Sequence, residues 1–301
     1  MILLEPGTLW RNIKTTTEQA LSGGNLVPIP TDSAFIEDSG VRFAVRVLAG
    51  LRRKAEARKE QDAAEHAGKQ ANPFLPPEKA LTVAKITDTH LAVLNKFNVV
   101  DHHLLIVTRA YEDQETLLTK ADFEALAVCM AEYDSLGFYN GGAAAGASQR
   151  HKHLQLVPLP LAPDVPTVPT EPLFARAKTG RDGLGTIPAF PFRHVFRRLG
   201  QGLWRSPLDA ATVLRESYCA MLEHVGMQPP ADRLTLQSQP YCFLATRTWL
   251  LLVPRSKEHV GEISFNSLAY AGSLFVYNEQ LLQKLREYGP MNALRDVAMP
   301  K

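Results

Sequence analysis

Alternating apolar and polar residues along the first half of the chain predict β-strands. Every second residue from position 41 to 47 is valine or phenylalanine, with Arg42 and Arg46 between them, as expected of a half-buried strand. The run Leu104-Leu105-Ile106-Val107 is apolar without a break, which favours a strand covered on both faces. Further extended segments are expected at residues 28–37, 91–98, 103–108, 138–140, 151–156, 234–236, 242–246 and 249–253.

A spacing of three or four residues between apolar positions predicts the helices. The first covers residues 9–21 and ends at Ser22-Gly23-Gly24, a sequence typical of a helix end. The second starts at Thr119, with Asp122 as a start signal, and continues to a stop at Gly137. Helices are also expected at 210–225 and 266–288. Because strands return through short connections and helices are grouped between them, we expect an α+β fold with a largely antiparallel sheet and helices packed on it.

Two segments interrupt this pattern. Residues 50–70 are polar and charged, and they predict either a solvated surface loop or a cationic flap that closes on a polyanion. Residues 158–172 are rich in proline and predict a stiff crossing between residues 1–160 and 161–301. The crossing either divides two domains or lies within one cooperative unit.

Composition and charge exclude several classes of protein. The chain has 301 residues, 45% of them hydrophobic, and its 33 Lys and Arg against 31 Asp and Glu leave a net charge of +2. This balance argues against disorder, nucleic-acid wrapping and binding to anionic lipid. No apolar run approaches the roughly 20 residues that span a bilayer, and no secretion signal is evident. Three distant cysteines form neither a zinc pair nor a disulfide framework, so we expect a cytoplasmic protein.

The segment around His151-Lys152-His153-Leu154-Gln155 carries the candidate chemistry. On a strand, His151, His153 and Gln155 share one face, and Lys152 and Leu154 share the other. The preceding loop of Gly, Ala and Ser lets backbone N–H groups approach phosphate oxygens. A neutral imidazole can attack phosphorus when a backbone carbonyl orients its second nitrogen. A glutamine amide can then donate to the phosphoryl group. Two histidines at this spacing alone would also suit a pair of metal ligands or a surface position without function.

Residues 146–155 resemble the signature of the diadenosine tetraphosphate phosphorylases, also called ATP adenylyltransferases, in the histidine-triad superfamily. The likeness extends from about residue 35 to 271. It includes residues 45–54, Asn72-Pro73-Phe74, Lys96-Phe97-Asn98, residues 103–108 and the strand exit at 249–257. The resemblance implies a histidine-triad-like fold, extended by C-terminal strands and helices.

The resemblance also implies an activity. His153 would attack the α-phosphate of a dinucleoside polyphosphate, ATP would leave, and phosphate would release ADP from an adenylyl-histidine in a reversible transfer. His151 would shape the pocket, and Gln155 would contact the transferred phosphoryl group. Ala144-Ala145 stands where the family usually has a serine. Substrate and phosphate would be held by Asn140, Gly146, Ala147, Ser148, Gln149, Asn72, Lys257 and Lys54, with Arg52 or Arg53 as substitutes for Lys54.

The resemblance implies small-molecule partners: a dinucleoside polyphosphate, ATP, ADP and phosphate, without nucleic acid or membrane. It implies no covalent cofactor and no metal ligands. A divalent cation such as Mg²⁺ could accompany the nucleotide, although the spacing of Asp32 and Asp38 does not require one. Two other functions compete. One is hexose-1-phosphate uridylyl transfer, whose enzymes have proline where Lys152 stands, and the other is a non-catalytic nucleotide sensor. The sequence indicates no oligomeric state.

Several other polar residues have two interpretations. His102 and His103 are interpreted as exposed loop residues, not as ligands. His194 could approach the site, although a role elsewhere is favoured. Arg255 and Lys257 lie at a strand exit, either as binding groups or in a solvated turn.

Overall fold

The computed structural model describes residues 1–48, 72–200, 202–229 and 235–301. The predicted loop or flap at 50–70, with Lys54, Arg52 and Arg53, lies outside the described residues. A ten-stranded sheet in which all neighbours are antiparallel forms the centre, which confirms the expected fold class. Its strands, in spatial order, are β3 (Thr82–Lys85), β4 (His90–Leu94), β5 (Leu104–Thr108), β7 (His153–Pro158), β6 (Ser135–Gly141), β11 (Tyr241–Ala245), β12 (Trp249–Pro254), β10 (Val195–Arg198), β9 (Leu184–Thr186) and β8 (Lys178–Thr179).

The middle strands of this sheet are covered on both faces. Every residue of β5, β11 and β12 is buried, as the unbroken apolar run at 104–107 predicted for β5. Along β11, Phe243 packs into one apolar cluster, while Cys242 and Leu244 pack into a second. The sheet therefore separates two cores, each closed by a different set of elements.

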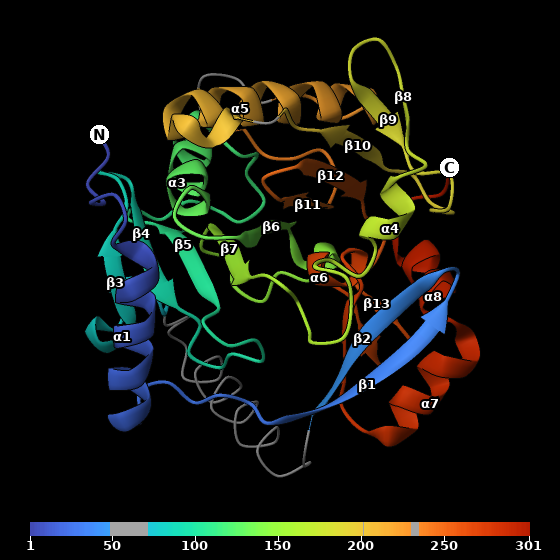
Figure 1. Cartoon of the computed structure of the whole chain (residues 1–301), viewed down its shortest axis with the longest axis horizontal. Helices are drawn as coiled ribbons and strands as arrows, with labels where there is room; N and C mark the ends of the chain where they lie inside the picture. The colour runs from blue at the N-terminus through green and yellow to red at the C-terminus, as the bar shows by residue number, and fades with distance from the viewer. Residues whose placement is uncertain (49–71, 201, 230–234) are drawn as a thin grey trace.

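Helices close the first core, and a small second sheet with further helices closes the other. α1 (Leu9–Ser22), α3 (Lys120–Met130) and α5 (Pro207–His224) contribute to the first core. The hairpin of β1 (Thr31–Asp38) and β2 (Val41–Leu48) lies beside the C-terminal helices α7 (Glu279–Tyr288) and α8 (Pro290–Val297), at the lower right of Figure 1. The apolar residues at 41, 43, 45 and 47 are all buried in the second core, as the alternation of β2 predicted.

Two predicted helices have different bounds in the structure. α3 begins as predicted, with a capping box between Thr119 and Asp122, but it ends at Met130 and not at Gly137. It ends there because β6 begins at Ser135 and leaves only a short turn. The long closing helix at 266–288 is wrong: this segment contains α6 (Ser267–Tyr270), β15 (Ser273–Val276) and α7.

Gly272 explains why the closing helix breaks. Its φ is +88°, in the left-handed region, and a Cβ there would meet Pro169 Cβ at 2.6 Å. The next four residues pair in parallel with β2 as β15, because that hairpin offers an open edge. Asn278 then accepts a hydrogen bond from the Leu281 N–H and starts α7.

The two halves of the chain contribute to one sheet, since β6 pairs with β11. A division at residue 160 stays a prediction. The expected strand at 234–236 begins outside the described residues, and Leu236 forms a single bridge with Thr116. No helix in the described ranges is long and apolar enough to cross a membrane. The remaining short elements are η1 (Lys79–Leu81), η2 (Ala143–Ala145), η3 (Leu203–Arg205), α4 (Glu171–Phe174), β13 (His259–Val260) and β14 (Ile263–Ser264).

Candidate active site

The three polar residues of the predicted strand face are all buried. His151 is 2% exposed, His153 4% and Gln155 9%. The strand β7 begins at His153, so His151 precedes it and forms only an isolated bridge with Asp113. Burial of polar side chains is unfavourable without hydrogen bonds, and each of the three has an identified partner.

His153 is held as the neutral tautomer that a nucleophile requires. Its Nδ1 donates to the backbone carbonyl of His151 at 2.8 Å, and Nε2 therefore carries the lone pair. Burial lowers the pKa of His153 to about 4, because the imidazolium form loses its hydration. The structure thus contains the orienting backbone carbonyl that the sequence predicted. Phe74 packs against this ring, with centroids 5.6 Å apart.

His151 is also fixed on both ring nitrogens. Its Nε2 donates to the Thr108 carbonyl at 2.7 Å, and its Nδ1 accepts from Asn72 Nδ2 at 2.8 Å. The Asn72 carboxamide oxygen in turn accepts from the Phe74 N–H. Burial lowers the pKa of His151 as well. Asn72 is therefore placed beside His151, where it holds the first histidine of the motif and the ring that covers the second.

Gln155 is oriented by His103, which the sequence analysis interpreted as an exposed loop residue. His103 is buried, not exposed, and its Nε2 donates to Gln155 Oε1 at 3.0 Å. Asn95 donates to the other ring nitrogen of His103, and burial lowers the pKa of His103 to about 4. The chain Asn95–His103–Gln155 fixes the amide so that its NH₂ group remains the donor. The pairing of Leu105 with Gln155 makes His103 a diagonal neighbour on the same face, a relation that appears only once the strands pair.

The glycine-rich loop between β6 and β7 is a compact turn. Gly146 has a φ of +90°, and a Cβ there would lie 2.7 Å from Asn266 Cβ. The N–H groups of Ala145, Gly146 and Ala147 already donate to carbonyls within the loop. Ser148 and Gln149 follow with backbone N–H groups that have no partner among the described residues. Of the predicted backbone donors, these two are best suited to donate hydrogen bonds to phosphate oxygens.

Asn140 lies at the end of β6, next to this loop. Its carboxamide oxygen accepts from both the N–H and the hydroxyl of Ser267, at 3.0 and 2.6 Å. The oxygen is thus used to hold α6 against β6. The NH₂ group, without a partner among the described residues, is left as the group that can donate to a ligand.

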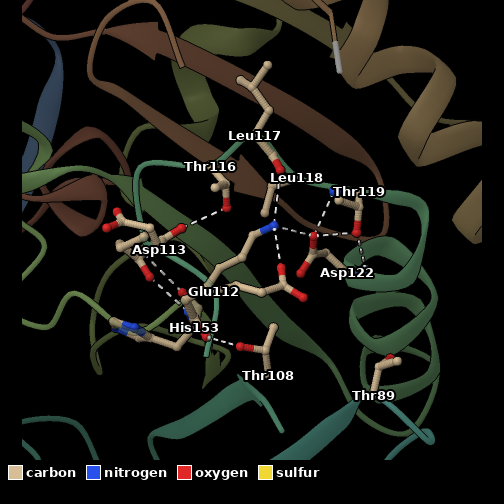
Figure 2. Close-up of polar contacts among 12 residues, drawn as sticks. Thr89, Thr108, Glu112, Asp113, Thr116, Leu117, Leu118, Thr119, Asp122 and His153 are labelled. Carbon is tan, nitrogen blue, oxygen red and sulfur yellow. Dashed lines mark hydrogen bonds and ion pairs between the residues drawn. The ribbon is translucent and has the colours of Figure 1, made fainter. Parts of the chain in front are cut away.

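A charged network lies on the opposite side of the motif. The Lys152 ammonium is fully buried and donates to Asp122 at 2.8 Å, to the Leu117 carbonyl at 3.0 Å and to Glu112 at 3.3 Å. Figure 2 shows the three partners around this ammonium: Glu112 and Leu117 come from the loop before α3, and Asp122 comes from the first turn of α3. Burial by itself raises the pKa of Asp122, but Lys152 and a hydrogen bond from His90 outweigh it and hold that pKa far below its usual range.

Three other candidates have different surroundings, and of these Arg255 reaches the glycine-rich loop through the Ala145 carbonyl at 3.4 Å. Arg255 is buried rather than in a solvated turn, and its guanidinium donates to the carbonyls of Val297, Lys257 and Phe265. The Lys257 side chain is exposed. His194 accepts from the Ile187 N–H and borders a cavity whose lining includes none of the predicted site residues. In the described ranges, no three His, Cys, Asp or Glu residues are grouped so that they could hold a metal ion.

Two models of known protein families match most of the chain. The family model described as the Ap4A phosphorylase N-terminal domain matches residues 1–176, more than half of the chain. The chain belongs to the Ap4A phosphorylase family. The model of the ATP adenylyltransferase C-terminal domain matches residues 188–300. The resemblance that the sequence motif suggested is thus confirmed for both parts of this family member.

Relatives from Saccharomyces cerevisiae match this family member over most of their length. It is 26% identical to diadenosine 5′,5‴-P1,P4-tetraphosphate phosphorylase 2 over 89% of this chain and 87% of that protein. It is 25% identical to Protein APA1 over 94% of this chain and 91% of that one. The crystal structure of yeast Ap4A phosphorylase Apa2 covers the whole of this chain, and this chain covers 96% of that structure, with a TM-score of 0.78 and 22% identity. That structure shows a shared fold.

Proposed function

We propose that this chain cleaves diadenosine tetraphosphate (Ap4A) with inorganic phosphate and gives ATP and ADP through a covalent adenylyl-His153. The observation that carries the proposal is the hydrogen bond from His153 Nδ1 to the His151 carbonyl, which presents a neutral Nε2 in a chain of this family. The yeast relative is named a tetraphosphate phosphorylase, and a yeast structure of the same fold was solved in complex with Ap4A.

The reaction balances without an added proton donor. In the first step, the Nε2 lone pair forms a bond to the α-phosphorus of one adenylyl group, and the bond to the bridging oxygen breaks, so that ATP leaves. The Nδ1 proton stays on the ring, where the His151 carbonyl stabilises the positive charge of the adenylyl-imidazolium. In the second step, an oxygen of inorganic phosphate attacks the same phosphorus, the P–N bond breaks, and ADP leaves with neutral His153 restored.

Fixed donors stabilise the negative charge that develops on the phosphoryl oxygens. The Gln155 NH₂ group, held in place through His103, is proposed to donate to the transferred group. The Asn140 NH₂ group and the backbone N–H groups of Ser148 and Gln149 are proposed to hold further phosphate oxygens. Such donors act strongly because they are already oriented before charge develops.

The direct test is to mix the protein with Ap4A and isotopically labelled phosphate and to separate the nucleotides. We expect ATP and ADP in equal amounts, with the label in the β-phosphate of ADP. Without phosphate, mass spectrometry should find an added AMP on the peptide that contains His153. Ap4A that binds but is never cleaved would instead support a nucleotide sensor, and turnover of UDP-glucose with galactose 1-phosphate would support uridylyl transfer.

The low pKa of His153 predicts a pH profile without an acid limb near 6.5. The neutral ring is the reactive form, so activity is present above the pKa and is lost only as pH falls toward about 4. We expect the rate of ATP release in a single turnover without phosphate to stay within about twofold between pH 7.5 and 5.5. Leaving phosphate out of the assay removes its own titration from the profile. A half-maximal rate near pH 6.5 would show that His153 is not held neutral.

Replacing His103 with phenylalanine should slow the transfer by releasing the Gln155 amide. The change removes the donor to Gln155 Oε1 while keeping an aromatic ring of similar size. By analogy with residues that orient metal ligands, we expect kcat to fall about 10- to 100-fold. The matched control is His102→Phe, since His102 is half-buried and contacts Thr17 instead. Equal kcat values in the two variants would show that His103 does not contribute to the transfer.

A further inference from the structure

The strands β6 and β7 separate where the candidate active site begins. Their pairs run from Ser135 opposite Pro158 to Phe138 opposite Gln155, and the ladder ends there. Two residues further along this register, Asn140 would face His153. The glycine-rich loop begins at Gly142, two residues after Asn140, so the separation of these strands sets the distance between the loop and the nucleophile.

The side chain of Gln114 fills the gap between the two strands. Its Nε2 donates to the Asn140 carbonyl at 2.9 Å and to the His153 carbonyl at 3.2 Å. Its Oε1 accepts from the His153 N–H at 2.8 Å. The residue is 2% exposed, and its own N–H donates to the Arg150 carbonyl at 2.7 Å. The buried Gln114 carboxamide thus makes the hydrogen bonds to the His153 N–H and carbonyl that a paired β6 would otherwise make.

We propose that Gln114 is a positioning residue for nucleotidyl transfer: its carboxamide acts as a spacer that holds the His153 main chain at a set distance from Asn140 and the loop. The proposal rests on the proposed function of His153. Directly paired strands lie about 4.8 Å apart, and an inserted amide keeps them wider. In-line attack on phosphorus is sensitive to displacements of about 1 Å, so loss of the spacer should act mainly on kcat.

The isosteric substitution Gln114→Glu tests the proposal through the pH dependence of activity, which a merely structural role of Gln114 would not change. Gln114→Glu keeps an acceptor for the His153 N–H but, when ionised, points an oxygen at the carbonyls of Asn140 and His153. When protonated, the introduced carboxyl regains one donor. Burial raises the pKa of such a group. The activity of this variant should therefore be present at low pH and lost as pH rises through the raised pKa.

The charged groups nearest Gln114 are Glu112, Asp113 and Glu115, and the Glu115 carboxylate lies beside Gly142. Glu112 contacts Lys152, Asp113 contacts Arg150, and His153 is neutral. The wild-type protein, measured over the same pH range, corrects for any of these groups. We expect kcat of Gln114→Glu to fall at least about tenfold between pH 6 and 8.5, with the wild type changing by less than about threefold. Parallel profiles for the two proteins would overturn the proposal.

A second variant separates positioning from general loosening of the loop. Gln114→Met keeps the volume but removes all three side-chain hydrogen bonds. We expect kcat to fall about 10- to 100-fold with KM for Ap4A within about threefold. The matched control is Tyr139→Phe, which removes hydrogen bonds to the Gln114 and Thr116 carbonyls in the same loop but leaves the spacer. Equal losses of kcat in both variants would assign Gln114 to loop stability alone.

Hydrogen exchange tests the spacer without any turnover. In Gln114→Met the His153 amide loses its acceptor, so this amide should exchange faster than in the wild type, whereas amides of α3 should not change. Unchanged protection at His153 would show that Gln114 does not hold the strand. If the wild type leaves Ap4A intact, the proposed function fails, and the exchange result still decides whether the spacer exists.

Discussion

His153→Ala should abolish the cleavage of Ap4A by phosphate while the protein stays folded. The substitution removes the protein atom that forms the bond to phosphorus in the first step of the proposed reaction, so we expect kcat to fall by about 10⁴-fold or more. The His151 carbonyl loses a buried donor, which costs about 1–3 kcal/mol of the free energy of unfolding. Release of ATP from Ap4A, followed by chromatography, measures the loss.

The control for this substitution is His259→Ala. His259 is an exposed histidine that pairs only weakly with Glu258, at 3.5 Å. We expect its kcat to equal that of the wild type, and far-UV circular dichroism should show that both variants are folded. An unchanged kcat in His153→Ala, or AMP still attached to the protein, would place the chemistry on another residue.

Lys152→Met should destabilise the fold more than any other single charge removal that we consider. The change leaves Asp122 buried without its cation, and breaking a buried pair in this way costs about 3–5 kcal/mol of the free energy of unfolding. Urea denaturation measures the loss. The deficit should narrow as pH falls toward 4, because a protonated Asp122 carries no uncompensated charge.

Two variants show whether this effect comes from burial. Lys120→Met removes a surface partner of Glu124, 3.6 Å away on the same helix, and should change stability by about 0.5 kcal/mol or less. Lys152→Met combined with Asp122→Leu removes both charges and should recover part of the loss, because neither ion is left alone. Equal free energies of unfolding for Lys152→Met and Lys120→Met would show that the buried network does not stabilise the strand that carries His153.

The buried network also explains the composition of the motif. His151 accepts a hydrogen bond from Asn72, and the rings of His151 and His153 both pack against Phe74. Lys152 between them donates to Asp122 on the other side of the segment. The alternation of a strand therefore places the chemistry and its charged support on opposite faces of one short segment. The sequence predicted this alternation, but it named no partner for Lys152.

Short-range patterns predicted much of the fold and of the site. The alternation at 41–47, the start of α3 at Thr119 and the unbroken apolar run of β5 depend on neighbours within one element, and the structure confirms each. The motif likewise brought together His151, His153 and Gln155, which lie within five residues. The closing helix at 266–288 was wrong because its break depends on Pro169 and on the open edge of β2, both far away in the chain.

The chain alone indicated the family through the resemblance carried by residues 146–155, and that resemblance implied His153 as the candidate nucleophile. The antiparallel character of the sheet was predicted from strands that return through short connections. Tertiary structure decided which groups surround that nucleophile. His103 reaches Gln155 across 52 positions, Gln114 reaches His153 across 39, and Lys152 reaches Asp122 across 30. Such contacts depend on strand register and on the path of a loop, so local propensities carry no signal for them. These long-range contacts are nevertheless necessary, because a polar group that becomes buried on folding needs a hydrogen-bond partner.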